Sequence, residues 1–270
     1  MTYQDLYTQI KKKKSFLCIG LDTDPSRIPG HLKRLEDPVY EFNKRIIDAT
    51  SDLCIAYKPN LAFYEALGPE GLLSLQKTIE YIPADIFTIA DAKRGDIGNT
   101  SELYAKAYFE KFSFDAITVN PYMGNDSVVP FLQFKGKWVI LLALTSNEGS
   151  MDFQLLKAPG KELYKQVILK SKDWAGPDQL MYVVGATQAE FLREIRVLIP
   201  DHFLLIPGIG AQGGDLESVV KNGINHSVGL IVNSSRSIIY ASKEEGFERA
   251  VRQKSQEIKK EMEDLMDKYL

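Results

Sequence analysis

Two aspartates and a lysine stand close together in one short stretch of the sequence, DIFTIADAKRGDIGNTS (85–101). Its apolar beginning leads into Asp91, Lys93 and Asp96. Side chains two residues apart on a β-strand point to the same face, so we expect Asp91 and Lys93 to lie side by side. Asp96 follows the strand end and is within reach of the same space. Because charges clustered beyond a buried strand usually mark a functional site, we interpret this stretch as one.

Two kinds of chemistry could use these charges. Mg²⁺ binds carboxylates together with substrate oxygens, so Asp91 and Asp96 could hold a metal ion. Alternatively, Lys93 and Lys58, which follows the preceding predicted strand, would already neutralise both carboxylates. Four groups of alternating sign need no added cation, and we therefore predict that the site contains no metal.

Eight short apolar runs alternate with helical segments along the chain. Several runs lack polar alternation, as expected of parallel strands that are buried on both faces. This count and rhythm predict an α/β fold, a closed (β/α)8 barrel (TIM barrel) with extra N-terminal and C-terminal helices. The predicted strands are 16–22, 54–60, the run that opens at 85, 116–122, 138–144, 180–186, 203–210 and 229–235. The predicted helices include 2–14, 38–52, 69–81, about 100–112 and about 243–268.

Composition limits the possible functions. A net charge of −3 and a pI near 5.8 argue against a nucleic-acid-binding surface, which needs an excess of basic residues. No apolar run approaches the roughly 20 residues that span a membrane, and residues 1–14 lack the apolar core of a signal peptide. Cys18 and Cys54 lie in apolar runs and are expected to be buried thiols. We therefore expect a cytoplasmic protein, with residues 1–270 forming one domain because no linker divides them.

Polar residues follow most of the predicted strands. In a (β/α)8 barrel the catalytic groups lie at the C-terminal ends of the strands, where the loops meet. Each residue taken alone could be a turn cap or a surface side chain, but their convergence on one rim predicts a single site. The residues at these positions are Asp22, Lys58, Asp91 with Lys93, Asn120, Ser146, Gly208 to Gly214, and Ser235 with Arg236.

The segment PGIGAQGGD (207–215) matches the G-x-G-x-x-G pattern of dinucleotide-binding proteins. That pattern normally follows the first strand of a βαβ unit, with an acidic residue about 20 positions later. Here it follows the seventh predicted strand, and no such acid follows the eighth. We favour a phosphate site in which glycine backbone amides approach the phosphate and Arg236 donates two hydrogen bonds. Gln212 could reach inward from the same loop.

The motif DAKRGDIGNT, with Asp22 after the first predicted strand and Lys58 after the second, closely resembles the orotidine 5′-phosphate decarboxylase family. The blocks KPNLAFYE, NPYMG-D-S, LTSN and PGIGAQGGD resemble its longer bacterial subgroup (type 2). The matching blocks run in the expected order from about residue 16 to residue 240. The resemblance implies conversion of orotidine 5′-phosphate to UMP and CO₂, the last step of de novo UMP synthesis, without a metal or organic cofactor.

The resemblance also implies roles for the charged residues. Lys93 would donate the proton to the ring carbon that CO₂ leaves, and Asp91 would lie against the substrate carboxylate. Lys58 would link the charges to the ribose, and Asp22 would bind a ribose hydroxyl.

Further contacts would come from the neighbouring subunit of a homodimer. Asp96, Ile97 and Thr100 match positions that family members contribute across the dimer interface into the partner's site. The remaining contacts implied by the resemblance are Ser146 with the pyrimidine, Gln212 between base and phosphate, and Arg236 with Gly210 and Ser235 around the phosphate.

Two alternatives remain open from the sequence. A Mg²⁺-dependent sugar-phosphate decarboxylase or aldolase of the same superfamily would share D-x-K-x-x-D but carry an acidic metal ligand in place of Lys58. A non-enzymatic barrel could bind a nucleotide phosphate as a sensor, although Asp91, Lys93 and Asp96 together argue against it.

Overall fold

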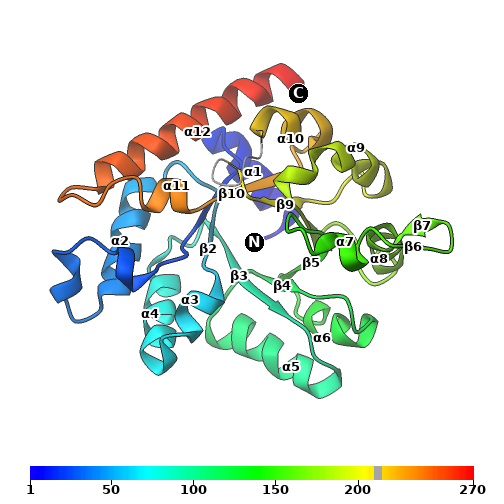
Figure 1. The fold of residues 1–270 in the computed structure, drawn as a ribbon, viewed down its shortest axis with the longest axis horizontal. Helices are drawn as coiled ribbons and strands as arrows, with labels where there is room; N and C mark the ends of the chain where they lie inside the picture. The colour runs from blue at the N-terminus through cyan, green and yellow to red at the C-terminus, as the bar shows by residue number, and fades with distance from the viewer. Residues whose placement is uncertain (210–214) are drawn as a thin grey trace.

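The computed structural model describes residues 1–209 and 215–270. Within them, eight parallel strands close into a barrel surrounded by helices, which confirms the predicted (β/α)8 fold (Figure 1). The order around the barrel is β1-β10-β9-β8-β5-β4-β3-β2. The barrel strands are β1 (Leu17–Gly20), β2 (Ala56–Lys58), β3 (Phe87–Arg94), β4 (Ala116–Val119), β5 (Trp138–Leu144), β8 (Leu180–Val184), β9 (Leu204–Pro207) and β10 (Leu230–Ser234).

The helices form the outer layer and include the expected extra elements at both ends of the chain. A two-stranded antiparallel hairpin, β6 (Lys157–Ala158) and β7 (Lys161–Glu162), lies outside the barrel. The α-helices are α1 (Tyr3–Lys13), α2 (Pro38–Thr50), α3 (Leu61–Glu65), α4 (Gly68–Tyr81), α5 (Gly98–Lys106), α6 (Val129–Leu132), α7 (Ser150–Phe153), α8 (Leu163–Ser171), α9 (Ala189–Leu198), α10 (Leu216–Gly223), α11 (Arg236–Ile239) and α12 (Glu248–Tyr269). A π-helical segment, Ala107–Lys111, continues α5.

Several predicted elements differ from the structure in their ends or length. The C-terminal helix was expected from about 243 but α12 begins at Glu248, after Gly246 at φ +76°. The helical pattern expected before β5 yields only the short helix α6, because Gly124 and Gly136 turn the chain on either side of it with positive φ. The strand predicted at 203–210 ends at Pro207.

The barrel interior is a packed core rather than a channel, as in other (β/α)8 barrels. Ala56 and Ile89, which lie two residues before Lys58 and Asp91 and so on the same faces of β2 and β3, are fully buried. Cys18 and Cys54 are also fully buried, as predicted, and burial raises the pKa of the Cys54 thiol to about 11. The polar cluster at one rim is therefore built on an apolar support.

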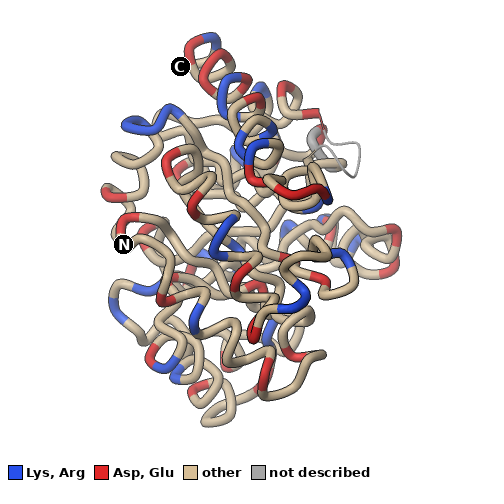
Figure 2. Tube along the Cα trace, turned by 90° about the vertical axis from the view of Figure 1, so that its left-hand side faces the viewer, with Lys and Arg blue, Asp and Glu red and all other residues tan. Residues whose placement is uncertain are grey.

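The surface shows no separation of charge on the side displayed in Figure 2, where basic and acidic segments are interspersed. This mixture agrees with the small net charge of the chain. Within residues 1–209 and 215–270, none of the helices combines the length and the apolar character needed to cross a bilayer.

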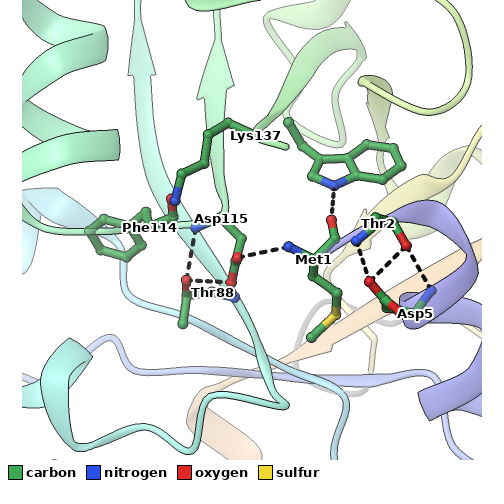
Figure 3. Close-up of polar contacts among 8 residues, drawn as sticks. Met1, Thr2, Asp5, Thr88, Phe114, Asp115 and Lys137 are labelled. Carbon is green, nitrogen blue, oxygen red and sulfur yellow. Dashed lines mark hydrogen bonds and ion pairs between the residues drawn. The ribbon is translucent and has the colours of Figure 1, made fainter. Parts of the chain in front are cut away.

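The N-terminal segment is fastened across the floor of the barrel, at the N-terminal ends of the strands (Figure 3). The indole Nε1 of Trp138 donates to the Met1 carbonyl oxygen at 2.8 Å, and the Met1 amino group lies 3.4 Å from Asp115 Oδ1. Asp115 Oδ2 accepts hydrogen bonds from the backbone nitrogen and the hydroxyl of Thr88, at 3.0 and 2.9 Å. Asp115 therefore joins the beginnings of β3 and β4 to the chain segment beneath them.

Replacing Asp115 should destabilise the protein at the N-terminal ends of the strands and leave the site at their C-terminal ends unchanged. The Asp115→Ala variant leaves the Thr88 donors without their acceptor, and we expect the free energy of unfolding to fall by about 2 kcal/mol. Urea unfolding measures this change. Asp85→Ala, in the exposed turn before β3, is the matched control and should change stability by less than about 0.5 kcal/mol. Equal effects of the two substitutions would contradict the assignment.

Candidate active site

The end of β3 departs from regular strand geometry. β3 pairs with β4 in register up to Ala90, and the register shifts before Arg94. Within this bulge Lys93 adopts φ +48°, in the left-handed region that costs about 1–2 kcal/mol for a residue with a side chain. The sequence predicted a regular strand here, and that prediction was wrong. The two side chains nevertheless meet, with Lys93 Nζ 2.5 Å from Asp91 Oδ1.

Asp91 is the centre of a charge triad formed with Lys58 and Lys93. Lys58 Nζ lies 2.7 Å from Asp91 Oδ2, so each carboxylate oxygen faces one ammonium group. Lys58 is only 3% exposed, whereas the Lys93 side chain is half exposed. The triad therefore has one ammonium fixed inside the barrel and one that reaches the opening.

Thr118 on β4 supports the triad and was missed by the sequence analysis. Its hydroxyl donates to Asp91 Oδ1 at 3.2 Å and accepts from the backbone nitrogen of Lys93 at 2.8 Å. The only signal was a polar residue in an otherwise apolar run. Thr118 links the carboxylate of Asp91 to the backbone that carries the half-exposed ammonium group of Lys93.

Opposing effects set the protonation of the buried groups. Burial favours the neutral form of Asp91, but the positive charges of Lys58 and Lys93 outweigh it and hold the pKa of Asp91 well below its usual range. Burial likewise disfavours the charged form of Lys58, yet Asp91 and Asp22 hold the pKa of Lys58 above its usual range. Asp91 and Lys58 therefore both stay ionised across the physiological pH range.

Two adjoining cavities open at this rim. The larger, of about 390 Å³, and the smaller, of about 170 Å³, share Lys58, Asp91 and Pro207. Eight of the residues predicted from the sequence line one or both of them: Asp22, Lys58, Asp91, Lys93, Ser146, Gly208, Ser235 and Arg236.

Two glycines allow the rim residues to approach the barrel. A Cβ at Gly20 would lie 2.7 Å from Ser235 Cβ, and a Cβ at Gly185 would lie 2.7 Å from the backbone nitrogen of Ser146. Ser235 Oγ donates to Asp22 Oδ2 at 2.8 Å and to the Gly20 carbonyl oxygen at 3.1 Å. Larger residues at either glycine would push apart the strand ends that carry the site.

Several predicted residues do not join this group. Asp96 Oδ1 accepts from the backbone nitrogen of Ile97 at 2.8 Å, and Ile97 is 55% exposed. Asp96, Ile97 and Thr100 line neither cavity of their own subunit. Gly210 and Gln212 lie outside the described residues.

The lining of the cavities indicates the kind of ligand they suit. Arg236 and the backbone of Gly208 line the smaller cavity, where the guanidinium could pair with an anionic group. Lys93 lines the larger one, and the buried carboxylate of Asp91 borders both. In the part of the chain that the structure describes, no cluster of three or more His, Cys, Asp or Glu is placed to hold a metal ion. The arrangement suits a ligand with a distant anionic group and a reacting atom near Lys93.

Comparison with known proteins gives one consistent result. The family model for "Orotidine 5′-phosphate decarboxylase / HUMPS family" matches residues 15–250. Proteins named orotidine 5′-phosphate decarboxylase from Flavobacterium johnsoniae and Phocaeicola vulgatus are 60% and 57% identical over 270 residues, which cover 99% and 98% of this chain and 99% of each relative. The solved OMP decarboxylase of Leishmania donovani superimposes with a TM-score of 0.85 at 34% identity, covering 98% of both chains. The chain therefore belongs to the orotidine 5′-phosphate decarboxylase family.

Proposed function

We propose that this chain is a decarboxylase that converts orotidine 5′-phosphate to UMP and CO₂ in pyrimidine biosynthesis. The observation that carries the proposal is the triad of Lys58, Asp91 and Lys93 at the mouth of a cavity that continues to Arg236. Family membership supports the choice of substrate. The proposal includes a cytoplasmic location, which the free, buried thiols of Cys18 and Cys54 support.

In the proposed reaction the bond between the ring carbon and the substrate carboxylate breaks, and CO₂ leaves. The electron pair of that bond remains on the ring carbon as a carbanion. The ammonium of Lys93 stabilises the developing negative charge and then donates a proton to the same carbon. Lys93 thereby becomes a neutral amine, which regains a proton from solvent before the next turnover.

Asp91 contributes by repelling the substrate carboxylate. Two like charges about 4 Å apart cost about 4 kcal/mol at an effective dielectric of 20. This repulsion disappears as CO₂ leaves, so it favours the transition state over the bound substrate. It is small against the roughly 20 kcal/mol that enzymes supply for very slow reactions, so we assign the larger share to Lys93 and to the binding of the distant phosphate.

The other predicted residues hold the substrate in this proposal. Arg236, with Gly210 and the backbone of Ser235, binds the phosphate, and Gln212 bridges the phosphate and the base. Ser146 lies beside the larger cavity and contacts the pyrimidine. Phosphate binding far from the reacting carbon keeps the repelled carboxylate in place.

The proposal also includes a homodimer in which each subunit completes the other's site. Ile97, Leu103 and Tyr122 are 55%, 61% and 79% exposed, which is unusual for large apolar side chains. Ser101 Oγ on α5 donates to the Ser127 carbonyl oxygen, so α5 packs against the segment that follows the Tyr122 loop. A second copy of the chain would cover these side chains and receive Asp96, Ile97 and Thr100 at its rim.

Removing the proposed proton donor should abolish turnover. For Lys93→Ala we expect kcat to fall on the order of 10⁴-fold or more, because both charge stabilisation and proton donation are lost. The decrease in absorbance of orotidine 5′-phosphate measures turnover. Lys135→Ala, at an exposed lysine with no side-chain partner among the described residues, is the control and should retain activity. Near-normal turnover by Lys93→Ala would refute the mechanism.

Removing Lys58 should change the titration of Asp91. Because Lys58 helps to lower the pKa of Asp91, Lys58→Met should raise that pKa. NMR titration of the Asp91 carboxyl carbon measures the change, and Asp91 should become protonated at a higher pH than in the unmodified enzyme. An unchanged titration of Asp91 would contradict this role, and Lys77→Met, at a surface ion pair with Asp37, provides the control.

Mixing two inactive variants tests the shared site. Lys93→Ala and Asp96→Ala each lose their own residue, but in a mixed dimer one of the two sites keeps both. Random reassociation should therefore restore about a quarter of the unmodified activity, since half of the dimers are mixed. Recovery after joint unfolding and refolding is measured by the decarboxylation assay. Absence of recovery, with dimers present on a sizing column, would show that Asp96 does not act across the interface.

A further inference from the structure

Two buried oxygen atoms near the pairing of β1 with β10 have no hydrogen-bond partner among the described residues. They are Asp22 Oδ1 and Asn233 Oδ1. Both residues line the smaller cavity, and Asn233 is only 6% exposed. A buried polar atom left unpaired costs about 1–3 kcal/mol, so such atoms in a cavity indicate a place where a ligand supplies the missing donor.

Gly20 keeps the space beside Asn233 open. A Cβ at Gly20 would lie 3.2 Å from Asn233 Oδ1 and 2.8 Å from Ser235 Oγ. Ser235 Oγ in turn donates to Asp22 Oδ2, which leaves Asp22 Oδ1 free. The absence of a side chain at Gly20 therefore creates a small recess bordered by the oxygens of Asp22, Ser235 and Asn233.

The chemistry of this recess selects the part of the ligand that fits it. The nearby protein donors already have acceptors. The Ser235 hydroxyl donates to Asp22 and Gly20, and the Lys58 ammonium pairs with Asp91. A phosphate brings negative charge and acceptor atoms, and Asp22 would repel it. A sugar hydroxyl brings a donor without charge. A neutral amide at Asn233 also avoids placing a third carboxylate beside Asp22 and Asp91.

We propose that Asn233 is a substrate-binding residue whose Oδ1 accepts a hydrogen bond from a ribose hydroxyl, next to the hydroxyl bound by Asp22. Asn233 thereby selects a ribonucleotide over the deoxynucleotide that lacks this hydroxyl. The inference rests on the proposed function, because it takes the nucleotide as the ligand. It adds a specificity-determining residue that lies on β10 itself and not in the loops of the rim.

The test measures binding of UMP, 2′-deoxy-UMP and 3′-deoxy-UMP by titration calorimetry. Asn233→Leu keeps the branched shape and removes the acceptor, and Asn233→Ala is the second variant if the first does not fold. We expect each substitution to weaken UMP binding about tenfold, as for loss of one buried hydrogen bond. One of the two deoxynucleotides should bind the unmodified protein about tenfold more weakly than UMP, and the substitution should not weaken it further.

Ser234→Ala is the matched control for this experiment. Ser234 is buried on the same strand, but its hydroxyl pairs with Ser237 at 2.8 Å and it does not line the cavity. We expect UMP affinity to be unchanged in this variant. Unchanged UMP binding in the Asn233 variants, or an equal loss for all three nucleotides, would overturn the proposal. Failure of the unmodified protein to decarboxylate orotidine 5′-phosphate would instead refute the proposed function, so the two failures are distinguishable.

Discussion

The ionised carboxylate of Asp91 is the constraint on which the rest of the site depends. A buried charge without partners would be neutralised or would destabilise the fold. The barrel avoids both outcomes by placing Lys58 and Lys93 on opposite oxygens of the carboxylate, at 2.7 and 2.5 Å. These groups come from neighbouring strands, so the pairing of β2 with β3 must be correct before the charges can compensate one another. The charge of Asp91 is therefore compensated only when β2 and β3 are correctly paired in the closed barrel.

The irregular backbone at Lys93 is held from both sides. The Arg94 carbonyl oxygen accepts from the backbone nitrogen of Asn120 at 2.8 Å, which fastens the strand end to the chain after β4. The Arg94 guanidinium donates to the Tyr108 hydroxyl at 2.6 Å and pairs with Glu65 on α3. These contacts compensate for a backbone conformation that a residue with a side chain seldom adopts. The ammonium of Lys93 is thus aimed by its backbone as well as by its attraction to Asp91.

Periodicity in the sequence was sufficient to predict the barrel because buried parallel strands leave uninterrupted apolar runs. All eight predicted runs contain a strand of the barrel, and β5 has the predicted ends. The bulge at 91–93 could not be predicted, because it depends on the register between β3 and β4 rather than on local sequence. The short length of α6 could not be predicted, because apolar spacing does not show where glycines will turn the chain.

The site was predictable to a similar extent and for a similar reason. Charged residues after strands are conspicuous, so Asp22, Lys58, Asp91 and Lys93 were found without the structure. Thr118 and Asn233 were not, because an uncharged polar residue within or at the end of an apolar run acquires meaning only when the neighbouring strand is known. Long-range pairing, which the linear sequence does not display, decides which of these side chains face the cavity.

The closed floor of the barrel has a consequence for the order of events in a turnover. The interior beneath the triad is filled with buried side chains, and the segment around Met1 lies across the far end. In the described part of the chain, no channel leads from the triad through the barrel to its far end. CO₂ must therefore leave by the same opening through which the nucleotide enters. While the nucleotide fills that mouth, CO₂ remains next to the carbon it has just left. In the proposed mechanism, rapid proton delivery by Lys93 then serves a second purpose, since it prevents the two fragments from recombining.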